Sequence, residues 1–235
     1  ATDRKATWIG DAKCLPDGSL LPEDPIAALE RLQTAWKSSP GDFPLSSGLV
    51  GFLSWGAVNL TEKLPDAKPA DYSIPLYGFN QFSELVVMDH QKSELLLVSV
   101  VFVDGTPLQD SYGQALNAIS QMQKIVEMPT PAMVSEPNWP EPDAVSNIPK
   151  NEFLEKVELA KEHVRKGDVF QVVISQRFDH QTTADALDVY RALRALNPSP
   201  YMYLIRWQDQ DGPFAIVGSS PEALVKVMGS NVVTH

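Results

Sequence analysis

The stretch Tyr201-Met-Tyr-Leu-Ile-Arg-Trp207, with Phe214-Ala-Ile-Val-Gly218 shortly after it, decides the fold class. Both runs are rich in β-branched and aromatic residues, and the connector Gln208–Gly212 has the composition of a turn. This pattern predicts an antiparallel hairpin. A second hairpin is predicted in residues 224–234, around a turn at 228–231.

Helices and further strands are predicted on either side of these hairpins. Apolar residues recur at helical spacing in four segments, residues 22–38, 108–126, 153–166 and 184–196. Apolar, β-branched runs predict strands at residues 47–55, 82–89, 94–102 and 168–178. Hairpins with interspersed helices favour an α+β fold over regular parallel winding.

Three positions carry specific local signals. Asp24 followed by Pro25 is typical of the first residues of a helix. Gly167 lies where a glycine ends a helix. Gly51, inside a predicted strand, indicates a bulge or a close approach of another backbone.

A change of composition suggests how the chain is organised. The segment between Pro129 and Pro149 is rich in proline and poor in regular apolar repeats. We therefore predict an amino-terminal region at residues 1–128, a linker at residues 129–149 and a second region at residues 150–235.

Composition excludes several functional classes. The 235 residues include 19 Lys+Arg and 30 Asp+Glu, a formal net charge of -11, and this charge disfavours nucleic acid and anionic membrane surfaces as partners. The single cysteine, Cys14, excludes an internal disulfide and any multi-cysteine zinc site. No apolar run is long enough to cross a membrane, and no signal peptide is recognisable. These features predict a cytoplasmic protein.

Three short segments are candidates for chemistry. On a strand at residues 168–178, Gln171 would share a face with Val169 and Val173, and a buried amide would belong either to a structural network or to a ligand cavity. The segment Asn197-Pro-Ser-Pro-Tyr-Met-Tyr203 is either a helix stop or a rigid binding turn. In Gly218-Ser-Ser-Pro-Glu222, the side-chain carboxyl of Glu222 is either a general acid or a solvated group in a turn.

Taken together and in order, these three segments closely resemble the chorismate-utilising enzymes, specifically the anthranilate synthase component I family. The segments Gly48–Trp55 and Glu84–His90 are similar to the amino-terminal region of that family. The resemblance implies two mainly antiparallel sheets packed face to face and flanked by helices, incomplete in this chain. It also implies that the chain is the amino-terminal and central portion of a longer protein.

The resemblance assigns roles to individual residues. Glu222 matches the general acid that protonates the departing 4-hydroxyl of chorismate. Gln171 matches the position where related isochorismate synthases carry a lysine base, and an amide there favours ammonia over water as the nucleophile. Contacts to the inhibitor tryptophan are implied for Pro200, Tyr201 and Met202, in a pocket shaped by Asn197 and Ser199.

The implied activity is that of a lyase of tryptophan biosynthesis, which converts chorismate and ammonia to anthranilate and pyruvate. The resemblance implies Mg²⁺, bound by ligands absent from these residues, and a glutamine amidotransferase subunit that supplies the ammonia. We expect the isolated chain to be inactive. Two alternatives stay open, aminodeoxychorismate synthase component I and a non-catalytic effector-binding or partner-docking module of the same fold.

Overall fold

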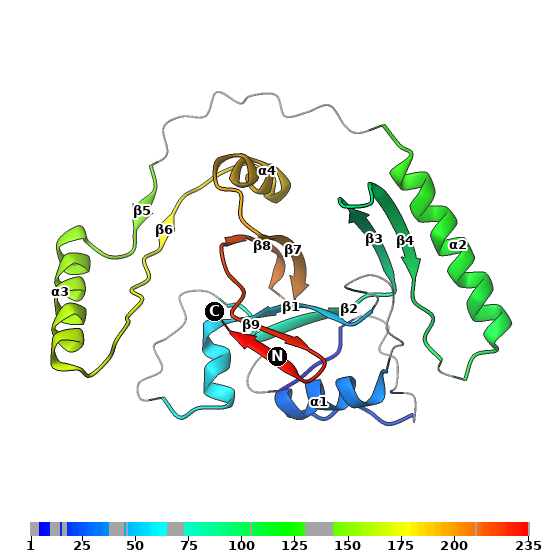
Figure 1. Ribbon diagram of the computed structural model, residues 1–235, viewed down its shortest axis with the longest axis horizontal. Coiled ribbons are helices and arrows are strands. Elements are labelled where there is room, and N and C mark those ends of the chain that lie inside the picture. Colours follow the sequence, from blue (N-terminus) through cyan, green and yellow to red (C-terminus); the bar gives the residue numbers. More distant parts are fainter. Residues whose placement is uncertain are drawn as a thin grey trace. The chain divides into compact units, whose positions relative to one another are not determined.

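The computed structural model describes residues 5–9, 15, 18–37, 45, 47–64, 73–103, 105–129, 143–209 and 211–234. Helices are interspersed with antiparallel strand pairs, so the predicted α+β class is confirmed (Figure 1). The chain divides into two compact units, residues 1–131 and 132–235. The boundaries predicted from composition stay a prediction.

The first unit contains two helices, one 3₁₀ helix and two strand pairs in its described part. In chain order these are α1 (Pro25–Ala35), β1 (Leu49–Leu53), η1 (Trp55–Leu60), β2 (Tyr77–Gln81), β3 (Glu84–Asp89), β4 (Glu94–Ser99) and α2 (Leu108–Val126). β1 pairs with β2 and β3 with β4, both antiparallel. The predicted helices and the predicted hairpin are confirmed.

A side-chain hydrogen bond links helix α1 to the β1–β2 pair. The Asp24 carboxylate accepts the Ala27 N–H at 2.8 Å, which caps α1, and Pro25 follows as the first helical residue. The buried Tyr77 hydroxyl donates to the Pro25 carbonyl at 2.9 Å. Burial raises the pKa of Tyr77, and the negative charge of Asp24 adds to this effect. The raised pKa widens the pH range over which the hydroxyl stays protonated and keeps the bond.

The close backbone approach predicted at Gly51 is confirmed. Gly51 pairs with Phe79 in the β1–β2 ladder. A Cβ atom at position 51 would overlap the Gly78 carbonyl and lie 2.8 Å from the Phe79 Cα. Only glycine fits there without moving the neighbouring strand.

The Asp89 side chain caps the turn of the β3–β4 hairpin. The Asp89 carboxylate accepts the backbone N–H groups of Gln91 and Lys92 at 2.9 Å and 3.0 Å. The Lys92 bond is the main reason that the pKa of Asp89 is lowered, and the Gln91 bond adds to it. Helix α2 packs against β4 and β3, with Met122 buried (Figure 1).

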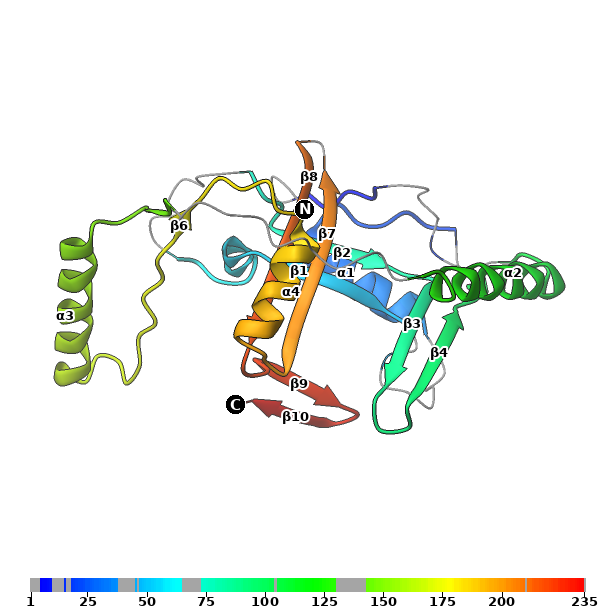
Figure 2. The same cartoon turned by 90° about the horizontal axis from the view of Figure 1, so that it is seen from above.

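The second unit contains the segments that carry the candidate site. Its elements are β5 (Val145–Ser146), α3 (Lys150–Lys166), β6 (Phe178–Asp179), α4 (Ala186–Leu196), β7 (Tyr201–Asp209), β8 (Gly212–Ser220), β9 (Val225–Met228) and β10 (Asn231–Thr234). The pairs β5–β6, β7–β8 and β9–β10 are antiparallel, so both predicted hairpins are confirmed. Helix α4 packs along β7 and β8 (Figure 2).

The hairpin ladders run further into their turns than the composition predicted. The β7–β8 ladder continues to the pair Asp209–Gly212, and the β9–β10 ladder continues to the pair Met228–Asn231. The predicted connectors 208–212 and 228–231 therefore belong partly to the strands. Turn composition does not reveal where the last backbone hydrogen bond forms.

The predicted strand at residues 168–178 is wrong for most of its length. Helix α3 ends as expected at Gly167, which has φ 79°, but only Phe178–Asp179 forms a ladder, with Val145–Ser146. The remaining residues run back from α3 without a paired strand in the part of the chain that the structure describes. Alternating side chains are necessary for a strand, but a strand also needs a partner that supplies its hydrogen bonds.

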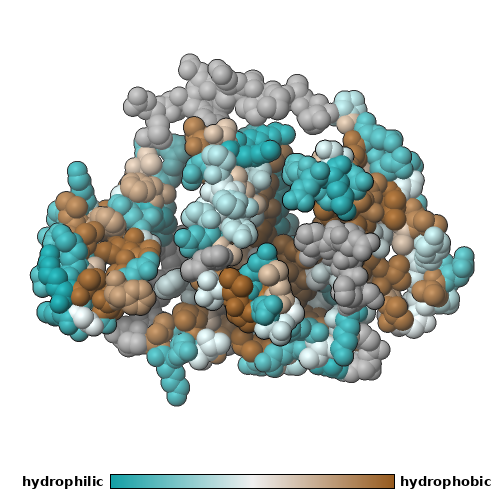
Figure 3. Space-filling view, in the orientation of Figure 1, coloured by the Kyte–Doolittle hydropathy of each residue, from teal (hydrophilic) through white to brown (hydrophobic). Residues whose placement is uncertain are grey.

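Few apolar side chains are fully enclosed. The buried apolar side chains among the described residues are Leu15, Pro25, Ala28, Pro75, Tyr77 and Met122. Figure 3 shows apolar surface, in brown, on the flank where α3 and the segment after it lie in Figure 1. Phe170 is 94% exposed and Val173 is 82% exposed, so this segment leaves large apolar groups uncovered.

Candidate functional site

A rigid turn joins α4 to β7 and contains the residues predicted to contact an effector. Asn197 ends α4, and its backbone N–H donates to the Leu193 carbonyl at 2.8 Å. Pro198 and Pro200 then fix two backbone φ angles before β7 begins at Tyr201. We call residues 197–202 the proline turn.

The side chains of the proline turn are accessible. Asn197, Pro200 and Tyr201 are exposed, whereas Ser199 and Met202 are partly buried. The Tyr201 residue is 46% exposed. The turn thus combines a fixed backbone with aromatic and apolar groups that a ligand can reach, which suits a binding surface.

The hairpin register places the proline turn beside the end of β8. Tyr201 pairs with Ser220, Met202 with Ser219 and Tyr203 with Gly218. The Tyr203 ring lies over Gly218, where it would overlap any Cβ atom. Two segments that are far apart in the sequence therefore form neighbouring rungs of one ladder.

Two serine hydroxyls extend this connection. The Ser219 hydroxyl donates to the Asn197 carbonyl at 2.8 Å, and the Ser220 hydroxyl donates to the Glu222 backbone carbonyl at 3.1 Å. Glu222 itself is exposed. The structure thus brings the predicted effector residues and the predicted general acid to the same end of the β7–β8 hairpin. We call Ser219–Glu222 the acid loop.

Sequence reasoning missed the roles of Ser219 and Ser220, although both lie inside the segment that was singled out for Glu222. Their partners are distant or are backbone atoms, so no residue pattern marks them. The register could have revealed one of them, since counting back from the pair Asp209–Gly212 places Met202 opposite Ser219.

The other end of α4 is anchored to β7. The Asp185 carboxylate accepts the Leu187 N–H at 2.8 Å, as a helix cap, and also accepts from the Arg206 guanidinium at 2.7 Å. Both groups are well exposed to solvent, so this ion pair fixes geometry more than it adds stability. Helix α4 is thereby attached to the hairpin near both of its ends.

Gln171 does not join this site. It lies in the extended segment after α3 and is exposed, so the premise of a buried amide among valines is wrong. Without ladder partners, the two faces of residues 168–177 are not separated into a core side and a solvent side. Gln176 is the amide in this segment that makes a contact, because its side chain donates to the Ser146 hydroxyl at 2.6 Å.

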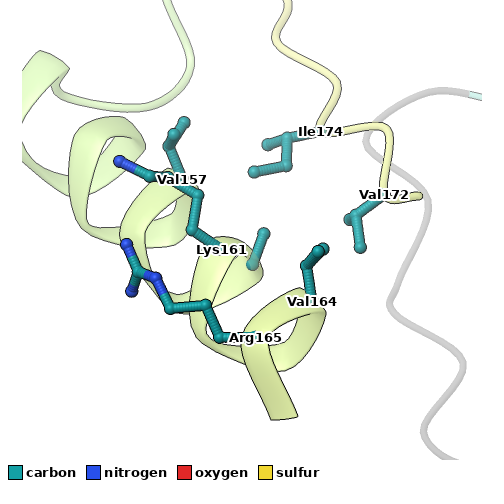
Figure 4. A pocket seen from close by; sticks show the side chains of 7 residues that line it. Val157, Lys161, Val164, Arg165, Val172 and Ile174 are labelled. Atoms are coloured by element: carbon teal, nitrogen blue, oxygen red, sulfur yellow. The ribbon is translucent and has the colours of Figure 1, made fainter. Parts of the chain in front are cut away.

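An open apolar groove of about 480 Å³ lies between α3 and the segment that returns along it. Figure 4 shows Val157 and Val164 on the helix facing Val172 and Ile174. Ala160 completes the apolar lining, and the basic residues Lys161 and Arg165 also line the groove. The helical spacing of apolar residues predicted for this segment thus forms one apolar face, which lies opposite Val172 and Ile174 across the groove.

The described residues do not form a metal site. No three His, Cys, Asp or Glu side chains converge among the residues that the structure describes, so Mg²⁺ has no set of ligands there. The same part of the chain contains no helix that is both long and apolar enough to span a bilayer.

Comparison with known proteins identifies the class. The chain belongs to the chorismate binding enzymes, because the model of that family matches residues 10–235. Within this class, its similar relatives include proteins named anthranilate synthase component 1. The relative from Mycolicibacterium smegmatis is 38% identical over 240 residues, and that from Arthrobacter globiformis is 34% identical over 252 residues. Each of these two alignments covers 99% of this chain and 45% of the relative.

A solved structure supports the same fold. The crystal structure of anthranilate synthase component I from Streptococcus pneumoniae TIGR4 matches with a TM-score of 0.74 and 27% sequence identity. The match covers 92% of this chain and 48% of that chain. The chain therefore spans about half the length of the relatives that it matches. The resemblance noted in the sequence is confirmed at the level of family and fold.

Proposed function

We propose that this chain is the amino-terminal and central portion of a component I of anthranilate synthase. The observation that carries the proposal is that the chain is similar, over 99% of its length, to a protein of that name. The position of the proline turn and the acid loop at one end of a single hairpin supports it. The reaction consumes chorismate and ammonia and yields anthranilate, pyruvate and water.

Glu222 is the proposed proton donor in this reaction. Ammonia forms the new carbon–nitrogen bond, and the 4-hydroxyl of chorismate takes a proton and departs as water. The ring then loses a proton and becomes aromatic as its bond to the enolpyruvyl oxygen breaks, and the released group takes up a proton to become pyruvate. Hydroxide is a poor leaving group, so a positioned acid at the 4-hydroxyl contributes about 10²- to 10⁴-fold to the rate. A buried carboxyl serves best as such a donor. Glu222 is exposed in this chain, so the rest of a longer protein would have to bury its carboxyl.

The uncovered apolar surfaces are consistent with a longer protein. The groove beside α3 and the exposed residues Phe170 and Val173 form the type of surface that is normally packed by further chain. We propose that the portion absent from these 235 residues covers them, supplies the Mg²⁺ ligands and completes the chorismate site. Gln171 would reach that site only in the completed fold. The isolated chain is then inactive.

Regulation and ammonia supply follow from the same proposal. Tryptophan binds at the proline turn, where Met202 and Tyr201 contact the indole and Pro200 keeps the backbone rigid. Asn197 and Ser199 shape the pocket. A separate glutamine amidotransferase subunit provides ammonia, so activity with glutamine requires that second protein.

The test measures product formation by the longer protein that carries this chain. With chorismate, Mg²⁺ and ammonium, we expect fluorescent anthranilate to form, and tryptophan to inhibit its formation. Glu222→Gln should lower kcat by about 10²- to 10⁴-fold with a much smaller effect on KM, because a group that acts in the transition state is lost. Glu62→Gln is the matched control, an exposed glutamate in the other unit, and should leave both constants unchanged.

Three results would contradict the proposal. A change confined to KM in Glu222→Gln would remove the acid role. Formation of aminodeoxychorismate instead of anthranilate would reassign the product. Turnover by the 235-residue chain alone would show that the absent portion is not needed for catalysis.

A further inference from the structure

Hydrogen bonds of two serine side chains join the proline turn directly to the acid loop, without passing through α4 or the turn between β7 and β8. Asn197 is held from two directions, because its N–H bonds to the Leu193 carbonyl in α4 and its carbonyl accepts the Ser219 hydroxyl. The next residue, Ser220, bonds to the Glu222 carbonyl. Two consecutive hydroxyls thus connect the first residue of the turn to the residue proposed as the acid.

We propose that Ser219 is a positioning residue that couples tryptophan binding at the proline turn to the placement of Glu222. The proposal rests on the function proposed above. Ser219 lies opposite Met202, on the rung where β8 meets the turn. A ligand that favours one arrangement of the turn moves the Asn197 carbonyl, and the hydroxyl bonded to it carries this displacement into the acid loop.

The neighbouring contacts explain why the displacement reaches the acid loop. The Tyr203 ring lies over Gly218, so the end of β8 that leads into the acid loop packs directly against β7. Tyr201 pairs with Ser220, so the turn and the loop share the last rung of the ladder. Both proline residues limit bending within the turn, so a shift is passed on rather than absorbed. Ser219 is the residue whose side chain crosses between the two segments.

The size of the effect follows from the bond that carries it. One neutral hydrogen bond contributes a net factor of about two to ten to an equilibrium. Removing the Ser219 hydroxyl should therefore weaken the coupling by about two- to tenfold without abolishing either site. Coupling is reciprocal, so the effect of chorismate on tryptophan affinity should shrink by the same factor.

The experiment uses the longer protein with its ammonia source and three variants. In Ser219→Ala we expect tryptophan to bind within about threefold of the wild type by calorimetry, while the activity that persists at saturating tryptophan rises about two- to tenfold. Ser219→Thr keeps the hydroxyl and should keep normal inhibition. Ser220→Ala is the matched control, since it removes the neighbouring hydroxyl within the acid loop. It should lower kcat without changing the fractional inhibition.

Each other outcome overturns the coupling. Normal inhibition in Ser219→Ala would show that the hydroxyl does not couple tryptophan binding to Glu222. A parallel loss of tryptophan binding and inhibition would show that the hydroxyl only supports the structure of the turn. If tryptophan inhibited the Ser219→Thr variant as weakly as the Ser219→Ala variant, the hydrogen bond would be excluded as the cause of the coupling. A wild-type protein that converts chorismate but ignores tryptophan would refute regulation at the turn, whereas one that does not convert chorismate would refute the proposed function itself.

Discussion

Substitution of Gly51 by alanine tests the close packing of β1 against β2. The added Cβ atom would overlap the Gly78 carbonyl and lie 2.8 Å from the Phe79 Cα, and both obstacles are backbone atoms that cannot rotate away. The strands must move apart, which breaks the ladder at its central rung. Overpacking of this kind costs about 1–3 kcal/mol. With a urea m-value of about 2 kcal/mol/M, the unfolding midpoint should fall by about 0.5–1.5 M.

The control is the same substitution at a glycine with free space. Gly113 lies inside α2, and nothing lies within 4 Å of a Cβ atom added there. Gly113→Ala should raise the free energy of unfolding by about 0.5–1 kcal/mol, because alanine favours the helix. Urea titrations followed by circular dichroism, with amide exchange across residues 49–53, measure both changes. Equal midpoints for the two variants, or a rise in Gly51→Ala, would refute the close approach.

Two further substitutions test the core of the first unit and the proline turn. Tyr77→Phe should lower the free energy of unfolding by about 1 kcal/mol, because the bond to the Pro25 carbonyl is lost. The raised pKa of Tyr77 adds a pH effect, since its contribution is complete below about pH 10 and is lost as the pH rises through the folded-state value. Urea midpoints at pH 8 and pH 11 should therefore differ more for the wild type than for the phenylalanine variant, and an equal loss in both would exclude Tyr77 as the source. In the longer protein, Met202→Thr should raise the half-inhibitory tryptophan concentration about 5- to 30-fold with turnover largely kept, because apolar contact to the indole is lost; inhibition assays check this, and a matching loss of activity and thermal stability would indicate damage to the fold instead.

The sequence predicted most reliably the features whose causes are local. The helix predicted at residues 108–126 has those bounds in the structure, because its apolar spacing, acidic first turn and basic last turn all lie within the helix itself. The end of α3 at Gly167 is equally local, since a positive φ favours glycine wherever it occurs. Asp24 and Pro25 marked the start of α1 for the same reason.

Features that depend on distant partners were predicted less well. The alternation in residues 168–178 was real, but strand formation depends on another segment that supplies hydrogen bonds, and only Phe178–Asp179 finds one among the described residues. The buried environment considered for Gln171 was wrong for the same reason, because it assumed a paired strand. The bond between Ser219 and Asn197 joins residues 22 positions apart, so it depends on the register of a whole hairpin. Motif recognition located the segment but not the contact.

The extended run from Val169 to Ile174 has a consequence for how this chain behaves at high concentration. It contains valine, phenylalanine and isoleucine, with no proline and no charged residue, and it is unpaired in the described part of the chain. Segments of this composition readily add strands from other molecules and so begin aggregates. Its open backbone groups and its large apolar side chains both favour such pairing, and Phe170 is 94% exposed. Colloidal stability of the isolated chain is therefore limited by the same six residues that a longer protein would enclose.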